Sequence, residues 1–128
     1  MKKLMYLLIL YPAFSYAGMA TRTPSVQIYV PDVPITVYIH VMPSFNTKAW
    51  AIEETPPELW RVVDQISDDG VFNAGVIKWG IFYGTKQKTL SYRIMPTKYG
   101  QRVKTFKGKV SFDGVSQPIT GISKLGRD

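Results

Sequence analysis

The feature that most constrains the fold is a strict alternation of apolar and polar residues over "ITVYIHVM", residues 35–42. The apolar members are Ile35, Val37, Ile39 and Val41. This period of two predicts a half-buried β-strand, because successive side chains of a strand point to opposite faces. Pro34 and Pro43 flank the stretch, at positions where a strand tolerates proline.

Similar short segments, separated by turn residues, recur along the chain and predict further strands. They are residues 24–31, 49–54, 60–67, 76–79, 89–95, 105–112 and 115–120. In the first of them, Val26, Ile28 and Val30 are expected to share one face. Asp113-Gly114 predicts a tight hairpin turn. No stretch shows helical periodicity, so the sequence predicts an all-β fold, an antiparallel immunoglobulin-like β-sandwich of seven or eight strands.

Residues 1–17 have the features of a cleavable signal peptide. Two lysines precede an apolar run that extends to Phe14, and small residues follow, with cleavage expected after Ala17 and a later alternative after Ala20. A retained membrane anchor is less favoured. The run is shorter than the roughly 20 residues that a span needs, and Pro12 interrupts it.

Residues 18–128 then form one domain, secreted to the periplasm or beyond the cell. The chain has no cysteine, so this domain must hold by core packing and hydrogen bonding without disulfides. The same absence excludes thiol nucleophiles and cysteine-ligated metal sites.

Charge is distributed unevenly along the chain, whose formal net charge is +7. Residues 18–77 carry a net charge of −4 and residues 78–128 a net charge of +9. This asymmetry is compatible with an acidic ligand, an anionic surface or head-to-tail assembly through opposite poles. The alternative is that lysines keep strand edges and outer faces from aggregating, since both halves of the chain interleave in a sandwich.

Five blocks in order resemble a module that is repeated in large secreted bacterial and archaeal proteins. The matching positions are Ile52-Glu53, Pro56-Pro57, Trp60, Gly70, Phe72-Asn73, Lys78-Trp79-Gly80, Phe82, Thr89-Leu90, Tyr92, Pro96, Gly108 and Ser111 to Gly114. The resemblance implies an immunoglobulin- or fibronectin-like sandwich, often found beside cohesin and dockerin modules, with no catalytic residues. Ile81 departs from the pattern, which usually has proline there.

The aromatic residues divide into two expected groups. Trp60, Trp79, Tyr92 and Phe112 are expected in the core, with strand carbonyls near turns accepting from the two indole N–H groups. Tyr92 resembles a tyrosine-corner residue, which gives its hydroxyl a structural role. A contact patch, with carbohydrate stacking as its weaker interpretation, would comprise Phe45, Trp50 and Tyr83.

The segment "KYGQRVKTFKGK", residues 98–109, is the candidate basic binding face. Its members are Lys98, Arg102, Lys104, Lys107 and Lys109. Interleaved aromatics would also suit single-stranded nucleic acid, but export makes nucleic acid an unsuitable partner. A protein, an acidic polysaccharide or an anionic surface polymer is expected instead.

Catalysis is not expected. His40 is the only histidine and stands in no catalytic motif. Glu53 and Glu54 are neighbours on a predicted strand, so they point to opposite faces and cannot share one site. Residues 68–70, "DDG", predict a turn, with a weak calcium site as the lesser alternative. No cofactor or metal is expected.

Together these features predict a secreted, non-enzymatic interaction module that binds a protein or an anionic polymer outside the cytoplasm. The alternative is a structural subunit that polymerises into an extracellular filament or layer. Polymerisation would proceed by strand exchange through an exposed N-terminal strand within residues 18–30, or by head-to-tail charge pairing.

Overall fold

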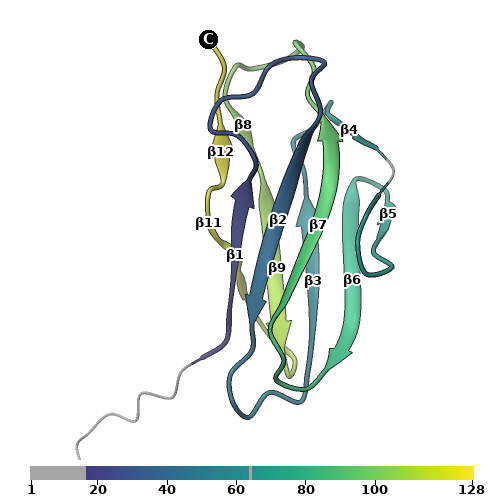
Figure 1. Cartoon of the computed structure of the whole chain (residues 1–128), viewed down its shortest axis with the longest axis vertical. Helices are drawn as coiled ribbons and strands as arrows, with labels where there is room; N and C mark the ends of the chain where they lie inside the picture. Colours follow the sequence, from purple (N-terminus) through teal and green to yellow (C-terminus); the bar gives the residue numbers. More distant parts are fainter. Residues whose placement is uncertain (1–16, 64) are drawn as a thin grey trace, which may run out of the picture.

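A computed structural model of the chain describes residues 17–63 and 65–128 (Figure 1). Apart from Ala17, the expected signal peptide lies outside these residues. Two five-stranded sheets enclose one hydrophobic core, and the described residues contain strands and turns but no helix. Accordingly, the described part of the chain offers no helix that could cross a membrane. The prediction of an all-β sandwich is confirmed.

The first sheet has the strand order β11-β1-β2-β7-β4. Its strands are β11 (Thr120–Gly121), β1 (Met19–Pro24), β2 (Ile35–Met42), β7 (Lys88–Met95) and β4 (Arg61–Val63). β1 pairs in parallel with β11, and the other neighbours are antiparallel.

The second sheet has the order β10-β9-β3-β6-β5, and all its neighbours are antiparallel. Its strands are β10 (Val115–Pro118), β9 (Lys107–Phe112), β3 (Ala49–Thr55), β6 (Val76–Tyr83) and β5 (Val71–Asn73). A short ribbon of β8 (Lys104–Thr105) and β12 (Lys124–Leu125) lies at one end of the molecule (Figure 1).

The two central strands of the first sheet follow the alternation read from the sequence. The buried residues of β2 are Ile35, Val37, Ile39 and Val41, and those of β7 are Leu90, Tyr92 and Ile94. Their intervening residues are half-buried or exposed. Apolar alternation therefore located the centre of the core correctly.

The strand predicted at residues 24–31 is wrong. The first strand comes earlier, as β1, and residues 25–31 form a loop with one isolated bridge at Ile28. Tyr29 is the buried residue there, while Ile28 and Val30 are exposed. Its hydroxyl donates to the Arg102 carbonyl at 2.9 Å. Burial of this large ring outweighs the alternation of smaller side chains around it.

β1 lies inside the first sheet, with β11 on one side and β2 on the other. Ala20 and Arg22 face the core and are fully buried. The structure therefore contradicts the expectation of an exposed N-terminal strand, which strand exchange would need.

β3 and β6 are offset by one extra residue in β6. Trp50 pairs with Phe82 and Ile52 pairs with Trp79, so three steps along β6 match two along β3. The bulge contains Gly80, whose φ is 121° and whose missing side chain leaves room for Ala51. Beside the bulge, the Trp50 and Phe82 ring centroids are 4.5 Å apart.

A buried ion pair joins the two sheets through the core. Arg22 on β1 donates to Glu54 on β3 twice, from Nε to Oε2 at 2.7 Å and from Nη2 to Oε1 at 2.5 Å. The Tyr92 hydroxyl donates to Oε2 of Glu54 at 2.8 Å, and Arg22 Nη1 donates to the Ile122 carbonyl at 3.1 Å. Every strong polar group of this cluster therefore has a protein partner.

This arrangement gives the Tyr92 hydroxyl a structural role, although its partner is a carboxylate and not the backbone of a tyrosine corner. Burial raises the pKa of Tyr92 well above its usual range, and the charge of Glu54 raises it further. Glu53 lies on the other face of β3, between Lys78 and Lys109 on the neighbouring strands. Glu53 and Glu54 thus point apart, as the sequence predicted.

Candidate binding groove

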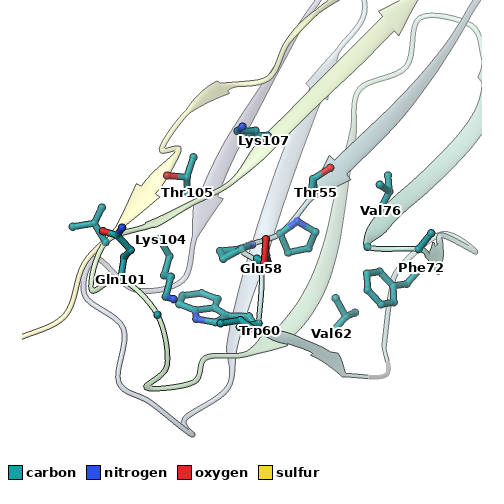
Figure 2. Close-up of a pocket in the computed structure, with 17 residues that line it drawn as sticks. Thr55, Glu58, Trp60, Val62, Phe72, Val76, Gln101, Lys104, Thr105 and Lys107 are labelled. Atoms are coloured by element: carbon teal, nitrogen blue, oxygen red, sulfur yellow. The ribbon is translucent and has the colours of Figure 1, made fainter.

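A groove of about 690 Å³ lies at the end of the sandwich, just beyond the last residue of β3 (Figure 2). Three segments line it, within residues 55–62, 72–76 and 100–107. The first connects β3 to β4, the second is the turn between β5 and β6, and the third leads into β8 and β9. We call this feature the end groove.

Two prolines explain why the groove forms at this point. The ladder between β3 and β9 ends with Thr55 opposite Lys107, and Pro56 and Pro57 follow. Proline has no backbone N–H, so the chain cannot continue the ladder and turns away. β8 lies beyond that point on one side and the β5–β6 turn on the other, which leaves the continuation of β3 open.

The groove has a largely apolar lining. Trp60 is buried and packs edge-on against Tyr29, with ring centroids 4.7 Å apart, and against Phe106 at 5.9 Å. Around it, Leu59, Phe72 and Val103 expose 58%, 43% and 55% of their surfaces. Large apolar side chains left exposed around a hollow are typical of a contact site.

Two hydrogen-bond donors in this lining have no carboxylate acceptor among the described residues. Lys104 is only 7% exposed, and its Nζ donates to the Tyr99 carbonyl at 2.6 Å. Neither ion pair found among the described residues involves Lys104. Nε1 of Trp60 is buried, and no described protein atom accepts its hydrogen.

The expectation that a backbone carbonyl accepts from each indole N–H is therefore correct for Trp79 and wrong for Trp60. Trp79 Nε1 donates to the Ser67 carbonyl at 2.9 Å, beside a turn. Trp60 has no such partner in the described chain. Both rings are buried, as is Tyr92, whereas Phe112 is half-buried and packs against the core.

The predicted basic face does not form a single surface. Lys98, Arg102, Lys107 and Lys109 are exposed, but Lys104 is buried. Lys104 and Lys107 line the end groove, while Lys109 lies opposite Glu53 on the outer face of the second sheet. Each sheet contains strands from both halves of the chain, so the acidic and the basic half are not separated into two layers.

The predicted aromatic patch is also incomplete. Phe45 and Tyr83 are 77% and 78% exposed, but Trp50 is 3% exposed and belongs to the core. Trp50 is buried because it shares the inner face of β3 with Ile52. Tyr83 ends β6, whose first residue Val76 lines the end groove, so the exposed aromatics lie at the opposite end of the sandwich.

The remaining polar candidates take part in local hydrogen bonds. His40 lies on the outer face of the first sheet, with Nδ1 2.8 Å from Thr89 Oγ1. Asp68 accepts from Lys88 Nζ at 2.9 Å, and this hydrogen bond lowers the pKa of Asp68. Both arrangements are hydrogen bonds between side chains at the surface of the sandwich.

Sequence reasoning missed most of the groove. Leu59 and Val103 belonged to no motif, Phe72 entered only as a position of the family resemblance, and Trp60 was interpreted as a core residue. The available signal was the pair Pro56-Pro57, because two prolines directly after a strand indicate that the strand ends there.

Comparison with known proteins identifies the fold. No protein-family model and no protein of curated function matches the chain. The N-terminal domain of a Streptococcus gordonii adhesin superposes with a TM-score of 0.67 at 8% identity, covering 86% of this chain and 32% of the adhesin chain. The chain thus spans about a third of that structure.

Two further structures are similar over nearly their whole length. The human F-spondin reeler domain has a TM-score of 0.59 at 10% identity, with 88% of this chain and 92% of that chain covered. A non-cellulosomal cohesin from Archaeoglobus fulgidus has a TM-score of 0.54 at 16% identity, with 86% and 91% covered. At such low identities the likeness establishes the β-sandwich fold alone.

Proposed function

We propose that this chain is an exported, non-enzymatic interaction module that binds an extended segment of a partner protein in the end groove. The observation that carries the proposal is the groove at the end of the second sheet, where β3 stops at Thr55 and residues 104–106 run on beyond the first residue of β9. An extended segment placed there would continue the line of β3. Addition of a strand to a sheet is a common mode of peptide recognition.

The dimensions and lining of the groove support a peptide ligand. Its volume of about 690 Å³ lies within the range of small-ligand sites. Leu59, Phe72 and Val103 offer apolar contacts for side chains on one face of a strand. Thr105 on β8 and Val76 on β6 border the two sides (Figure 2).

Location outside the cytoplasm is supported by the signal-peptide pattern, and β1 indicates which of the two cleavage sites is used. Cleavage before Gly18 would leave β1 whole, whereas cleavage after Ala20 would remove a fully buried residue that pairs with Val41. The adhesin, reeler and cohesin domains that share the fold are consistent with an extracellular module. We therefore favour release after Ala17, with residues 18–128 as the mature domain.

The polymerising alternative has less support. β1 is paired on both sides, and the four edge strands of the two sheets are short, from two to four residues each. Short edges discourage pairing between copies. No observation in the described chain favours self-assembly over partner binding.

The proposal can be tested by selecting ligands from a displayed library of random linear peptides. We expect recovered peptides to lose binding when Phe72→Ser and Val103→Ser are combined, because both side chains are exposed around the groove. The matched control is Val71→Ser combined with Val115→Ser, since both residues are exposed and neither lines the groove.

Two results would contradict the proposal. One is a library that yields no binder above background. The other is a set of binders that tolerate the groove variant and lose binding on Phe45→Ser combined with Tyr83→Ser, which would place the contact surface at the opposite end.

A further inference from the structure

We infer that the end groove selects an acidic peptide segment, with the carboxylate of an Asp or Glu side chain accepting hydrogen bonds from Lys104 Nζ and Trp60 Nε1. This inference rests on the proposed function and adds the chemistry of the ligand. The ligand is an extended stretch of a partner protein in which the acidic residue and an apolar residue share one face.

Lys104 is the first reason. An ammonium offers three donors, and among the described residues only the Tyr99 carbonyl accepts from this one, at 2.6 Å. Lysine is rarely buried unless it is paired. Lys104 is only 7% exposed, yet it has no ion-pair partner among the described residues. A carboxylate from a ligand would supply the missing countercharge.

Trp60 is the second, independent reason. Its exposed fraction is 6%, and no described protein atom accepts from Nε1. A buried donor without an acceptor is costly, and native structures keep few of them. In Figure 2 the Lys104 side chain extends toward the Trp60 ring, and both residues line the same groove.

The ammonium packs closely against Gly100 in the wall of the groove. Gly100 lines the groove next to Lys104, and a Cβ at this position would lie 2.7 Å from Nζ. Gly100 has a φ of 81°, a conformation that glycine adopts without strain. A side chain at this position would crowd the ammonium, and glycine avoids that.

Charge around the groove agrees with an acidic ligand. Lys107 also lines it, and Lys98 and Arg102 are exposed on the segment that leads to β8. Glu58 is the acidic residue of the lining, is exposed, and forms no ion pair with Lys104. A basic setting of this kind attracts an acidic segment and opposes a basic one.

Apolar groove residues determine the rest of the ligand. Val62 and Phe72 line the groove together with the two donors. Alternate residues of an extended segment point to the same side. A segment lying along the continuation of β3 can therefore direct its carboxylate toward Lys104 and an apolar side chain toward Phe72 at the same time.

The test compares two pools of synthetic peptides that differ only in whether one side chain ends in a carboxylate or an amide. Both pools are amidated, contain no other charged residue and vary randomly elsewhere; one has a fixed central Glu and the other a fixed central Gln. Binding to the purified protein is measured by fluorescence anisotropy at low and physiological salt. We expect the Glu pool to bind about tenfold more tightly, as a charge-assisted hydrogen bond predicts.

Variants assign the preference to Lys104. Lys104→Gln, which keeps a donor for the Tyr99 carbonyl but has no charge, and Lys104→Met should both abolish the preference for Glu while the Gln pool binds as before. Lys109→Gln is the control, because this lysine lies outside the groove lining. Far-ultraviolet circular dichroism of each variant establishes that it is folded.

The outcomes separate this inference from the proposed function. Equal binding of the two pools, or a Glu preference that survives both Lys104 variants, overturns the inference and leaves peptide binding in the groove intact. Failure of both pools to bind overturns the proposed function and the inference with it.

Discussion

Arg22 and Lys104 are both basic, both buried and both close to the aromatic cluster of Tyr29, Trp60 and Phe106, but their surroundings differ. Arg22 is 1% exposed and meets Glu54 through two short hydrogen bonds. Lys104 is 7% exposed, and in the described part of the chain it donates only to the carbonyl of Tyr99. The first lies between the sheets, and the second lies in the end groove, beyond the last residue of β3.

The difference separates structural charge from functional charge. Within the core, the guanidinium, the carboxylate and the Tyr92 hydroxyl satisfy one another, so removing one leaves the others buried without partners. At the end groove, the ammonium and the Trp60 indole are both donors. The fold therefore depends on Arg22, whereas we expect ligand binding to depend on Lys104.

The largest effect is expected at the centre of the core network. Glu54→Gln removes the charge that compensates Arg22 and should lower the free energy of unfolding by about 3–5 kcal/mol. Urea denaturation measures the change. Glu53→Gln, on the outer face of the same strand, should stay within about 0.5 kcal/mol. If the two variants were equally stable, the network would have no special role.

A smaller loss is expected where β9 passes the ion pair. A Cβ on Gly108 would collide with Glu54 Oε1, and it would lie 2.6 Å from Ile119 Cδ1 and 2.9 Å from Arg22 Nη2. Gly108→Ala should therefore cost about 1–3 kcal/mol through overpacking. Gly126→Ala is the control, because its nearest neighbour would be 3.9 Å away. Equal midpoints in urea would contradict this account of the packing.

Tyr92→Phe should lower the free energy of unfolding by about 1–3 kcal/mol at neutral pH, since it removes a buried hydrogen bond to a carboxylate. Its pH dependence has a definite sign. The pKa of Tyr92 is raised in the folded state, mainly by burial, so the unfolded chain loses this proton first. The contribution is fully present below about pH 10 and is lost as pH rises further.

The wild type should therefore lose more stability than Tyr92→Phe between about pH 10 and pH 12. Urea denaturation at several alkaline pH values gives the difference. A constant difference across this interval would show that the Tyr92 proton does not distinguish the two states.

The smallest effect is expected at the exposed pair of Asp68 and Lys88, whose side chains are 26% and 39% exposed. Asp68→Asn should lower the free energy of unfolding by at most about 1 kcal/mol, because solvent screens such pairs. Thermal unfolding at low and high salt measures the change, and the loss should shrink as salt rises. A loss comparable with that of Glu54→Gln would erase the distinction between exposed and buried pairs.

Much of the sandwich could be predicted because alternation reports burial directly. β2 and β7 alternate with apolar residues on one face, and the prediction that Glu53 and Glu54 point to opposite faces of their strand is correct. The partner of Glu54 was missed because β1, "MATRTP", has no apolar alternation. Its inner face combines a small residue, an arginine and a proline.

The end groove could not be predicted for a different reason. It arises where three segments distant in sequence meet at the end of β3. Nothing in the sequence around Lys104 distinguishes it from the exposed lysines at 107 and 109, since burial here is set by the turn at residues 98–100 and by Trp60. Only the tertiary structure separates one buried lysine from its exposed neighbours.

The most direct test of this account compares the free energies of unfolding of Arg22→Met and Lys104→Met. Arg22→Met leaves the Glu54 carboxylate in the core without a charged partner and should lower the free energy of unfolding by about 3–5 kcal/mol. Lys104→Met removes a charge that has no carboxylate partner in the described chain and should stay within about 1 kcal/mol of the wild type. Equal losses for the two variants would contradict the account and would make Lys104 a structural residue.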